Sequence, residues 1–223
     1  TIFQACKTHG FHPDFYSWHR YGSYPRDHEM LDVPESLMRV AQEVGIPAPN
    51  IILSEWNIGL PKPTYPGLDD QRAANYYMAT IMALAQTPGT DAQFFFLQDA
   101  PWDTHKEFAG ESVGVFSLAG APKAVLSGMR MMATAADLPM VPLERTGGTS
   151  NINLFASRQG NQGYVLAVNT FGSGMDKHAS IMLRAAGVDL SQLKRETKTI
   201  KGYIGGKTGR ASVERLGLEA FIL

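Results

Sequence analysis

One carboxylate stands at the end of a strongly apolar run, and it is the side chain of this sequence best placed to do chemistry. Glu55 follows the segment 51–54 (Ile-Ile-Leu-Ser) and precedes Trp56 and Asn57. Such a run is typical of a strand covered on both faces of a parallel sheet, and barrel enzymes build their active sites at the carboxyl ends of those strands. Ionising a carboxylate there costs desolvation energy, so we expect hydrogen bonds or a chemical use for Glu55. The alternative is a structural Glu that caps a helix or pairs with a cation at the strand end.

Polar and aromatic side chains also end two neighbouring strands of the predicted sheet. This mixture suits sugar binding, because aromatic faces stack on the C–H faces of a ring while amide, imidazole and carboxylate groups bind its hydroxyls. A phenol beside a carboxylate can orient it for nucleophilic attack. The candidate binding residues are His19 and Tyr21, which lie two apart and so on one face, together with Asn57, Gln98 and Trp102. Structural roles are the alternatives: a satisfied histidine at His19, and a plug of a barrel mouth at Trp102.

The elements that must position these residues alternate between strand and helix up to about residue 138. Strands are expected at 14–21, 51–56 and 92–98, and helices at 33–44, 69–86 and 122–136. A β-α-β-α-β-α order predicts a parallel sheet with crossover helices.

After Pro139 the pattern changes to short strands separated by Gly and Asn turns. Expected strands cover 152–157, 163–170, 179–184, 195–201 and 212–222, and the turn at 158–163 suits a hairpin. Regular spacing of this kind indicates an antiparallel β-sandwich. The sequence therefore predicts two domains, 1–138 and 139–223.

Composition narrows the function classes. The 223 residues carry 20 Lys+Arg and 21 Asp+Glu, a net charge of −1 without a basic stripe, so no nucleic-acid partner is expected. No apolar run is long enough to predict a membrane span. The single Cys6 excludes an internal disulfide and a Cys-based zinc cluster, and we expect no cofactor or metal.

Thr1 does not look like a natural start, so we expect this chain to be the C-terminal portion of a longer protein.

Four stretches resemble a known group of enzymes, the clan A retaining glycoside hydrolases, and most closely family 39, which includes β-xylosidases and α-L-iduronidase. Residues 14–21 (DFYSWHRY) are similar to that family's sixth barrel strand, and 52–57 (ILSEWN) to its seventh. Residues 70–79 (DQRAANYYMA) resemble the helix that follows, and 114–123 (GVFSLAGAPK) the approach to the eighth helix. The resemblance covers roughly residues 1–138.

The resemblance implies an α/β fold, namely strands 6–8 of a (β/α)8 barrel followed by a sandwich, and a role for each motif residue. Glu55 would be the nucleophile, Tyr21 its hydrogen-bond partner and His19 a contact to sugar hydroxyls. The general acid/base Glu follows an Asn at the end of the family's fourth strand, and this chain has no such Asn-Glu pair, so we expect the fragment alone to be nearly inactive. Phe95 stands where the family usually presents a Trp. The implied substrate is a glycoside or an oligo- or polysaccharide, and an extracellular or periplasmic location is expected from the enzyme class alone.

Three other functions remain open from the residues: a non-catalytic binding protein, a polysaccharide lyase and a deacetylase. In a non-catalytic carbohydrate-binding protein, Glu55 would only accept hydrogen bonds. A polysaccharide lyase would need a cation to neutralise a uronate, but Arg20 faces away from His19, and a metal-dependent deacetylase would need clustered ligands. The histidines are too scattered to predict such a cluster: His9, His12, His19, His28, His105 and His178.

Overall fold

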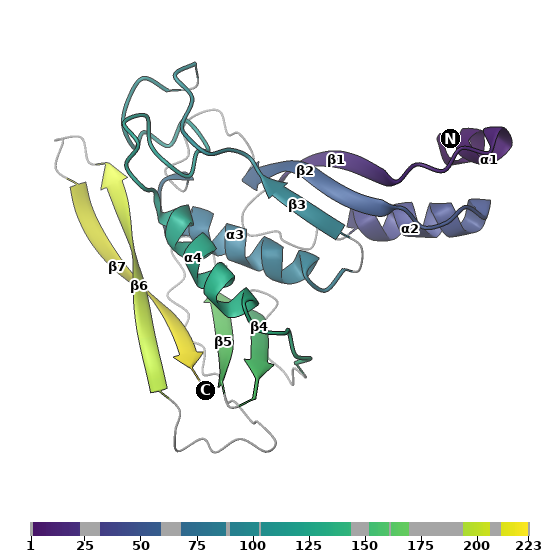
Figure 1. The fold of residues 1–223 in the computed structure, drawn as a ribbon. Coiled ribbons are helices and arrows are strands. Elements are labelled where there is room, and N and C mark those ends of the chain that lie inside the picture. The colour runs from purple at the N-terminus through teal and green to yellow at the C-terminus, as the bar shows by residue number, and fades with distance from the viewer. Residues whose placement is uncertain are drawn as a thin grey trace.

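The computed structural model describes residues 2–22, 32–58, 68–87, 90–102, 104–143, 152–160, 162–169, 194–205 and 211–222. Helices and parallel strands alternate through its first part (Figure 1). In chain order the elements are α1 (Ile2–His9), β1 (Phe15–Gly22), α2 (Asp32–Val44), β2 (Asn50–Ile58), α3 (Gln71–Leu84), β3 (Thr90–Phe94) and α4 (Ala124–Ala136). Within these ranges, every helix is too short or too polar to cross a bilayer.

The first three strands form a parallel sheet in the order β1-β2-β3. This confirms the predicted β-α-β-α-β-α order and the mixed α/β class. The described residues supply three strands of this sheet, so its closure into a barrel stays a prediction.

Two strand boundaries differ from the prediction. The strand that was expected to end at residue 56 continues as β2 to Ile58, because its pairing with β1 extends to Gly22 opposite Ile58. The register shifts between Leu53 and Trp56 on the β3 side, so that both of these side chains enter one apolar cluster although they are three apart. The sequence could not show this irregularity, because strict alternation would put them on opposite faces.

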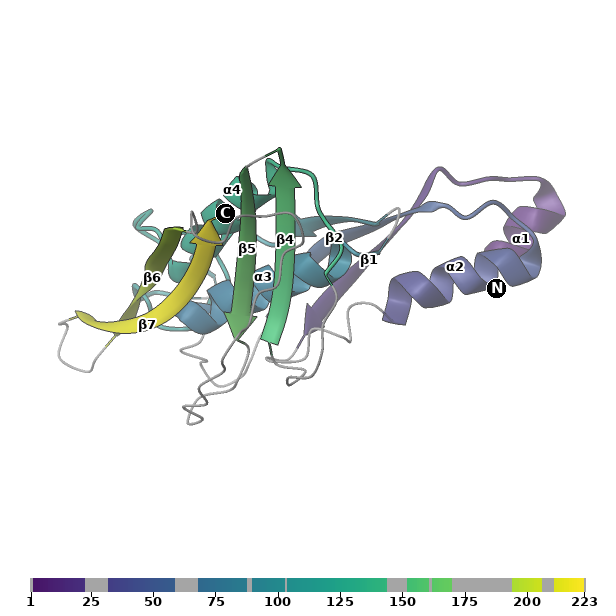
Figure 2. The same cartoon turned by 90° about the horizontal axis from the view of Figure 1, so that it is seen from below.

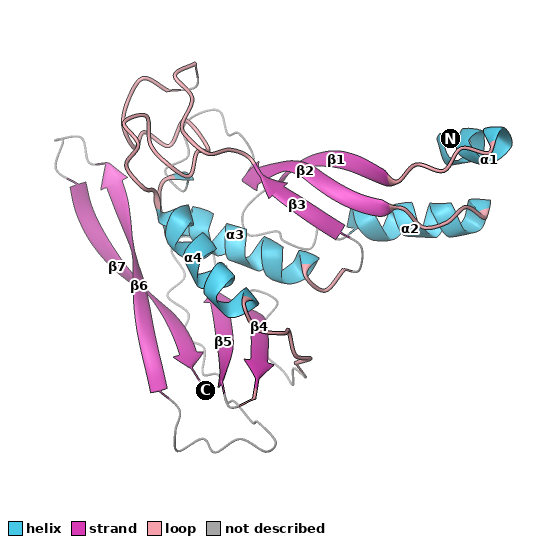
Figure 3. Ribbon diagram, viewed as in Figure 1, coloured by secondary structure: helices cyan, strands magenta, loops and turns pink. Residues whose placement is uncertain are grey.

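The third strand ends earlier than expected, at Phe94. Beyond it the backbone changes partner: Phe95 N still donates to Trp56 O at 3.0 Å, but the next carbonyls, of Phe96 and Leu97, accept from Val115 and Phe116. The segment that was predicted as the end of the strand is thus paired with the return of its own loop. That loop appears in Figure 3 as a folded length of irregular chain between β3 and α4.

Helix α3 packs on both sides and carries most of the core. One face meets β2 and β3 around Trp56, whose ring stacks on Tyr77 at 5.6 Å, and burial raises the pKa of the Tyr77 phenol. The other face meets α4, where Gly128 lies so close to Ala74 that an added Cβ would stand 3.2–3.4 Å from its atoms. The site strands therefore rest on a well-packed helix pair.

The C-terminal part forms an antiparallel sheet in the order β4-β5-β7-β6. Its strands are β4 (Ile152–Gln159), β5 (Gln162–Asn169), β6 (Lys194–Gly205) and β7 (Ala211–Ile222), and they confirm four of the five predicted strands. The expected strand at 179–184 lies outside the described residues. Seen from below, β4 and β5 lie across α3 and α4 (Figure 2), and the apolar cluster that joins them contains Met78, Met132, Phe155 and Leu166.

The predicted domain boundary falls where α4 leads into this sheet. Arg158 N donates to Pro139 O at 2.9 Å and Val141 N to Ala156 O at 3.0 Å, so the chain pairs with β4 directly after α4. The described residues place one sheet against the helices, and both the sandwich and the division at 138/139 stay predictions.

Candidate active site

The parallel register of β1 and β2 brings three of the predicted site residues together. His19 lies opposite Glu55, and Tyr21 lies opposite Asn57. Because side chains two apart share a face, His19 and Tyr21 flank the carboxylate from one strand. The register of β1 against β2 shifts between Trp18 and His19, and the pairs from His19 onward follow this irregularity.

Both oxygens of the Glu55 carboxylate have a neighbour from β1. The Tyr21 hydroxyl donates a hydrogen bond to Oε1, and His19 Nδ1 lies 3.5 Å from Oε2. The histidine contact is too long for a strong hydrogen bond, so the phenol is the group that fixes the carboxylate. The Glu55 side chain is 28% exposed and His19 is 59% exposed. Glu55 is therefore held in place and still accessible to a ligand, as a nucleophile must be.

Phe95 supplies the wall beside this group. Its ring packs edge-on against Tyr21, with the centroids 6.2 Å apart and the planes at 81°. The peptide between Phe95 and Phe96 is cis. Phe95, which stands where the family that this chain resembles usually has a Trp, thus lies beside the Tyr21–Glu55 pair.

The Asn57 side chain points into the protein. It is 2% exposed, its Nδ2 donates to the carbonyls of Phe95 and Val113, and its Oδ1 accepts from Ile58 N at 2.7 Å. A sugar contact by Asn57 stays a prediction, but the described geometry gives this amide another use.

Gln98 and Trp102 lie beyond the end of β3. Gln98 is exposed and donates to Leu118 O at 2.8 Å, and Trp102 is 79% exposed. Among the described contacts none joins either residue to Glu55, His19 or Tyr21. Their predicted role in substrate binding stays untested.

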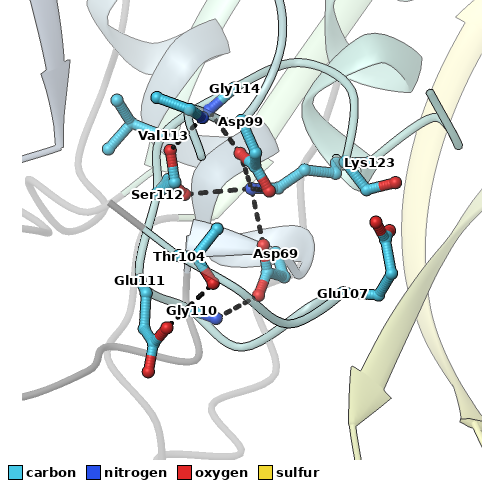
Figure 4. Close-up of polar contacts among 12 residues, drawn as sticks. Asp69, Asp99, Thr104, Glu107, Gly110, Glu111, Ser112, Val113, Gly114 and Lys123 are labelled. Carbon is cyan, nitrogen blue, oxygen red and sulfur yellow. Dashed lines mark hydrogen bonds and ion pairs between the residues drawn. The ribbon is translucent and has the colours of Figure 1, made fainter. Parts of the chain in front are cut away.

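A buried ion cluster under the long loop was not predicted. Lys123, at the start of α4, is fully buried, and its Nζ lies 2.6 Å from Asp69 Oδ1 and 2.9 Å from Asp99 Oδ1 (Figure 4). The same ammonium donates to Ser112 O at 3.0 Å. One signal for it was present in the sequence: a cation at a helix N-terminus is unfavourable for the helix dipole, so a Lys there calls for a carboxylate partner.

The two carboxylates of the cluster also hold the loop through hydrogen bonds from its backbone. Asp69 Oδ2 accepts from Gly110 N at 2.5 Å, and Asp99 Oδ1 accepts from Gly114 N at 2.8 Å. Two carboxylates share one ammonium, and burial raises the pKa of Asp69 while the charge of Lys123 opposes the rise. Farther along, Thr104 donates to Glu111 at 2.8 Å. The loop beyond β3 is therefore anchored from inside.

No group of three or more metal-binding side chains forms within the residues that the structure describes. The chemistry available at Glu55 is that of a carboxylate with a phenol and an imidazole beside it.

Comparison with known proteins identifies the fold. No family model matches the sequence, and no curated protein matches it either. Solved structures do match. A monomeric β-xylosidase from Caulobacter crescentus CB15 superposes with a TM-score of 0.63 at 12% identity, over 99% of this chain and 57% of that one. A glucosidase from Croceicoccus marinus gives 0.61 at 16% identity, over 97% and 41%. The GH39 enzyme from Xanthomonas axonopodis pv. citri gives 0.60 at 11% identity, over 99% and 56%.

These matches show that the chain has the fold of part of these glycosidases. The chain spans about half the length of the structures it matches. At this level of identity the likeness establishes the fold and does not establish the family.

Proposed function

We propose that this chain is part of a retaining glycoside hydrolase in which Glu55 is the nucleophile. The observation that carries the proposal is the Glu55 carboxylate on β2, bound by the Tyr21 hydroxyl and flanked by His19. It is supported by the fold, which is that of glycoside hydrolases. Hydrolases with this fold place their reactive groups where parallel strands end.

The mechanism is a double displacement. Glu55 Oε2, the oxygen that the phenol leaves free, attacks the anomeric carbon as the glycosidic C–O bond breaks, and a second carboxylic acid gives its proton to the departing oxygen. That carboxylate then takes a proton from water, whose oxygen displaces Glu55 and restores the starting state. The two carboxyl groups of retaining enzymes lie about 5–5.5 Å apart.

In this proposal the second carboxylate lies outside the 223 residues, in the part of the barrel that precedes β1. The family 39 resemblance supports this, since its acid/base motif is absent here, and so does the length of the matched xylosidase and glucosidase. Residues 1–138 would then complete a barrel and residues 139–223 would form an accessory β domain. The 223-residue chain alone is expected to hydrolyse glycosides poorly.

The substrate class is an oligo- or polysaccharide or a simpler glycoside. His19 is exposed beside Glu55 and is placed to contact a sugar hydroxyl, while Gln98 and Trp102 are candidates for more distant contacts. Family 39 specificity, as in the matched β-xylosidase, is the finer version of this proposal.

Replacement of the nucleophile tests the proposal. In the full-length parent protein, Glu55→Gln removes the attacking oxygen with little change of shape, and turnover of aryl glycosides is expected to fall by about 10⁴-fold or more. Glu43→Gln is a matched control, because Glu43 is exposed on α2 and forms a surface ion pair with Arg39 at 4.0 Å.

Proton NMR of the first product then reports the mechanism. Retention of the anomeric configuration is expected, whereas inversion would contradict a nucleophilic Glu55. Unchanged turnover in Glu55→Gln would leave only a binding role for this carboxylate.

A further inference from the structure

Asn57 is the residue next to the site whose polar atoms are most completely used inside the protein. Its two amide hydrogens serve two carbonyls, those of Phe95 and Val113 (2.9 Å for the latter), and its oxygen accepts from Ile58 N. It is 2% exposed. Both amide hydrogens are therefore used inside the protein, and the buried side chain has no free donor for a sugar hydroxyl.

The two carbonyls belong to segments that no regular strand holds. Phe95 comes directly after β3, where the chain changes partner, and Val113 lies on the return of the long loop. From its place on β2, the Asn57 amide therefore links the segment after β3 to the end of the long loop.

The loop side of this joint is rigidly anchored. Lys123 Nζ binds Ser112 O at 3.0 Å, and Asp99 accepts from Gly114 N at 2.8 Å, so both neighbours of Val113 are tied to the buried ion cluster (Figure 4). An added Cβ on Gly114 would stand 2.2 Å from Asp99 N, which shows how tightly this segment is packed. With Val113 O fixed, the amide has a firm support from which to hold Phe95.

The strand side of the joint leads to the nucleophile. The Phe95 ring rests edge-on against Tyr21, and Tyr21 donates to Glu55. A shift of Phe95 would change the wall on which the phenol rests, and with it the direction of the Glu55 oxygens.

We propose that Asn57 is a positioning residue: its buried amide sets the Phe95 wall against the anchored loop and so keeps Tyr21 in contact with Glu55, without touching the substrate. This inference rests on the proposed role of Glu55 as nucleophile, and it replaces the sugar contact expected from the sequence.

The test separates binding from chemistry. In the full-length parent protein, inactivation by a reactive 2-deoxy-2-fluoro glycoside gives a binding constant for the sugar and a rate constant for attack by Glu55. For Asn57→Ser we expect the rate constant to fall by about 10²-fold, the loss typical of a small misplacement of reacting groups, with the binding constant changed less than about threefold. Weaker binding with an unchanged rate constant would show a sugar contact and overturn the inference.

Gln86→Ala is the matched control. It also removes an amide that donates to a backbone carbonyl, Met82 O at 3.0 Å, but it does so at the end of α3 away from the site segments. Both constants are expected to stay at their parent values. If Asn57→Ser does not fold, the double variant Lys123→Met/Asp69→Asn loosens the loop anchor without leaving two unpaired carboxylates, and it should slow attack in the same way. Parent-like kinetics in that variant would overturn the inference.

A second readout does not depend on activity. 3-Fluorotyrosine at position 21 reports by ¹⁹F NMR on the contact with Glu55. We expect Asn57→Ser to move its resonance in the same direction as Glu55→Gln does, whereas Gln86→Ala leaves it in place. If no glycoside labels the parent, the proposed function fails and this resonance still decides the inference: an unmoved signal in Asn57→Ser overturns it.

Discussion

Lys123 is the side chain whose removal should damage the structure most for its size. It is fully buried between two carboxylates that are each 3% exposed, at 2.6 Å from Asp69 and 2.9 Å from Asp99. Lys123→Met keeps the length and removes the charge, which leaves two like charges buried without an opposite charge beside them. Breaking a buried ion pair in this way costs about 3–5 kcal/mol. In a chain of this size that corresponds to a fall in Tm of roughly 6–20 °C.

The loss should depend on pH in a stated direction. Burial raises the pKa of Asp69 above its ordinary value of 3.8, so the folded state binds this proton more tightly than the unfolded state does. The stability that comes from the protonated form is complete below 3.8 and is lost as pH rises through the folded pKa. Without Lys123 the pKa of Asp69 rises further, because the opposing charge is gone. The variant's loss of stability relative to the parent is therefore largest near pH 8 and shrinks on acidification.

Urea unfolding of parent and variant at about pH 8 and at about pH 5 measures both quantities. Arg39→Met is the control, because its ion pair with Glu43 is 67% and 65% exposed and should contribute about 0.5 kcal/mol or less. Lys123→Met/Asp69→Asn should recover part of the loss and show a smaller pH dependence, because one buried carboxylate, Asp99, remains without the ammonium. A loss below about 1 kcal/mol near pH 8, or one that acidification does not reduce, would refute the account of the cluster.

Three further substitutions test the site and its support. Tyr21→Phe removes the hydrogen bond to Glu55, and because such a bond to a charged group contributes about 1.5–3 kcal/mol, kcat/KM of the parent protein for aryl glycosides should fall roughly 10- to 150-fold; a change of less than about twofold would show that the phenol does not orient the carboxylate. Gly114→Ala adds a Cβ at 2.2 Å from Asp99 N, which donates to Phe116 O, and at 2.5 Å from Gln98 C. Thermal unfolding should therefore show a loss of about 3 kcal/mol or more, and a parent-like Tm would contradict the packing. Ser157→Ala removes the hydroxyl that donates to Ala135 O at 2.5 Å and should cost about 1 kcal/mol in urea unfolding; an unchanged midpoint would mean that this bond does not hold β4 to α4.

The sequence predicted most where local pattern and burial agree. The apolar run before Glu55 and the period of α3 both follow from residues that must face one core, and the spacing of His19 and Tyr21 places them on one side of a strand. Because parallel strands end at one edge of a sheet, the meeting of Tyr21, His19 and Glu55 could be expected before any coordinates.

The parts that the sequence did not predict depend on long-range partners. The early end of β3 goes with the return of the loop, which pairs with residues 96–99, a contact that no local pattern encodes. The irregular register of β2 likewise shows only in its pairing with the neighbouring strands. The internal use of the Asn57 amide also depends on distant partners, since only the positions of Phe95 O and Val113 O show it. Asp69 and Lys123 are far apart in the chain, and their pairing is a property of the folded loop.

Mechanism-based labelling tests the central claim most directly. The full-length parent protein would be treated with a panel of 2-deoxy-2-fluoro glycosides, and the adduct would be located by peptide mass mapping. The account predicts a covalent glycosyl ester on Glu55, and the sugar that reacts would begin to define the substrate. A label on a different carboxylate, or a folded protein that binds glycans and takes up no label from any sugar, would contradict it.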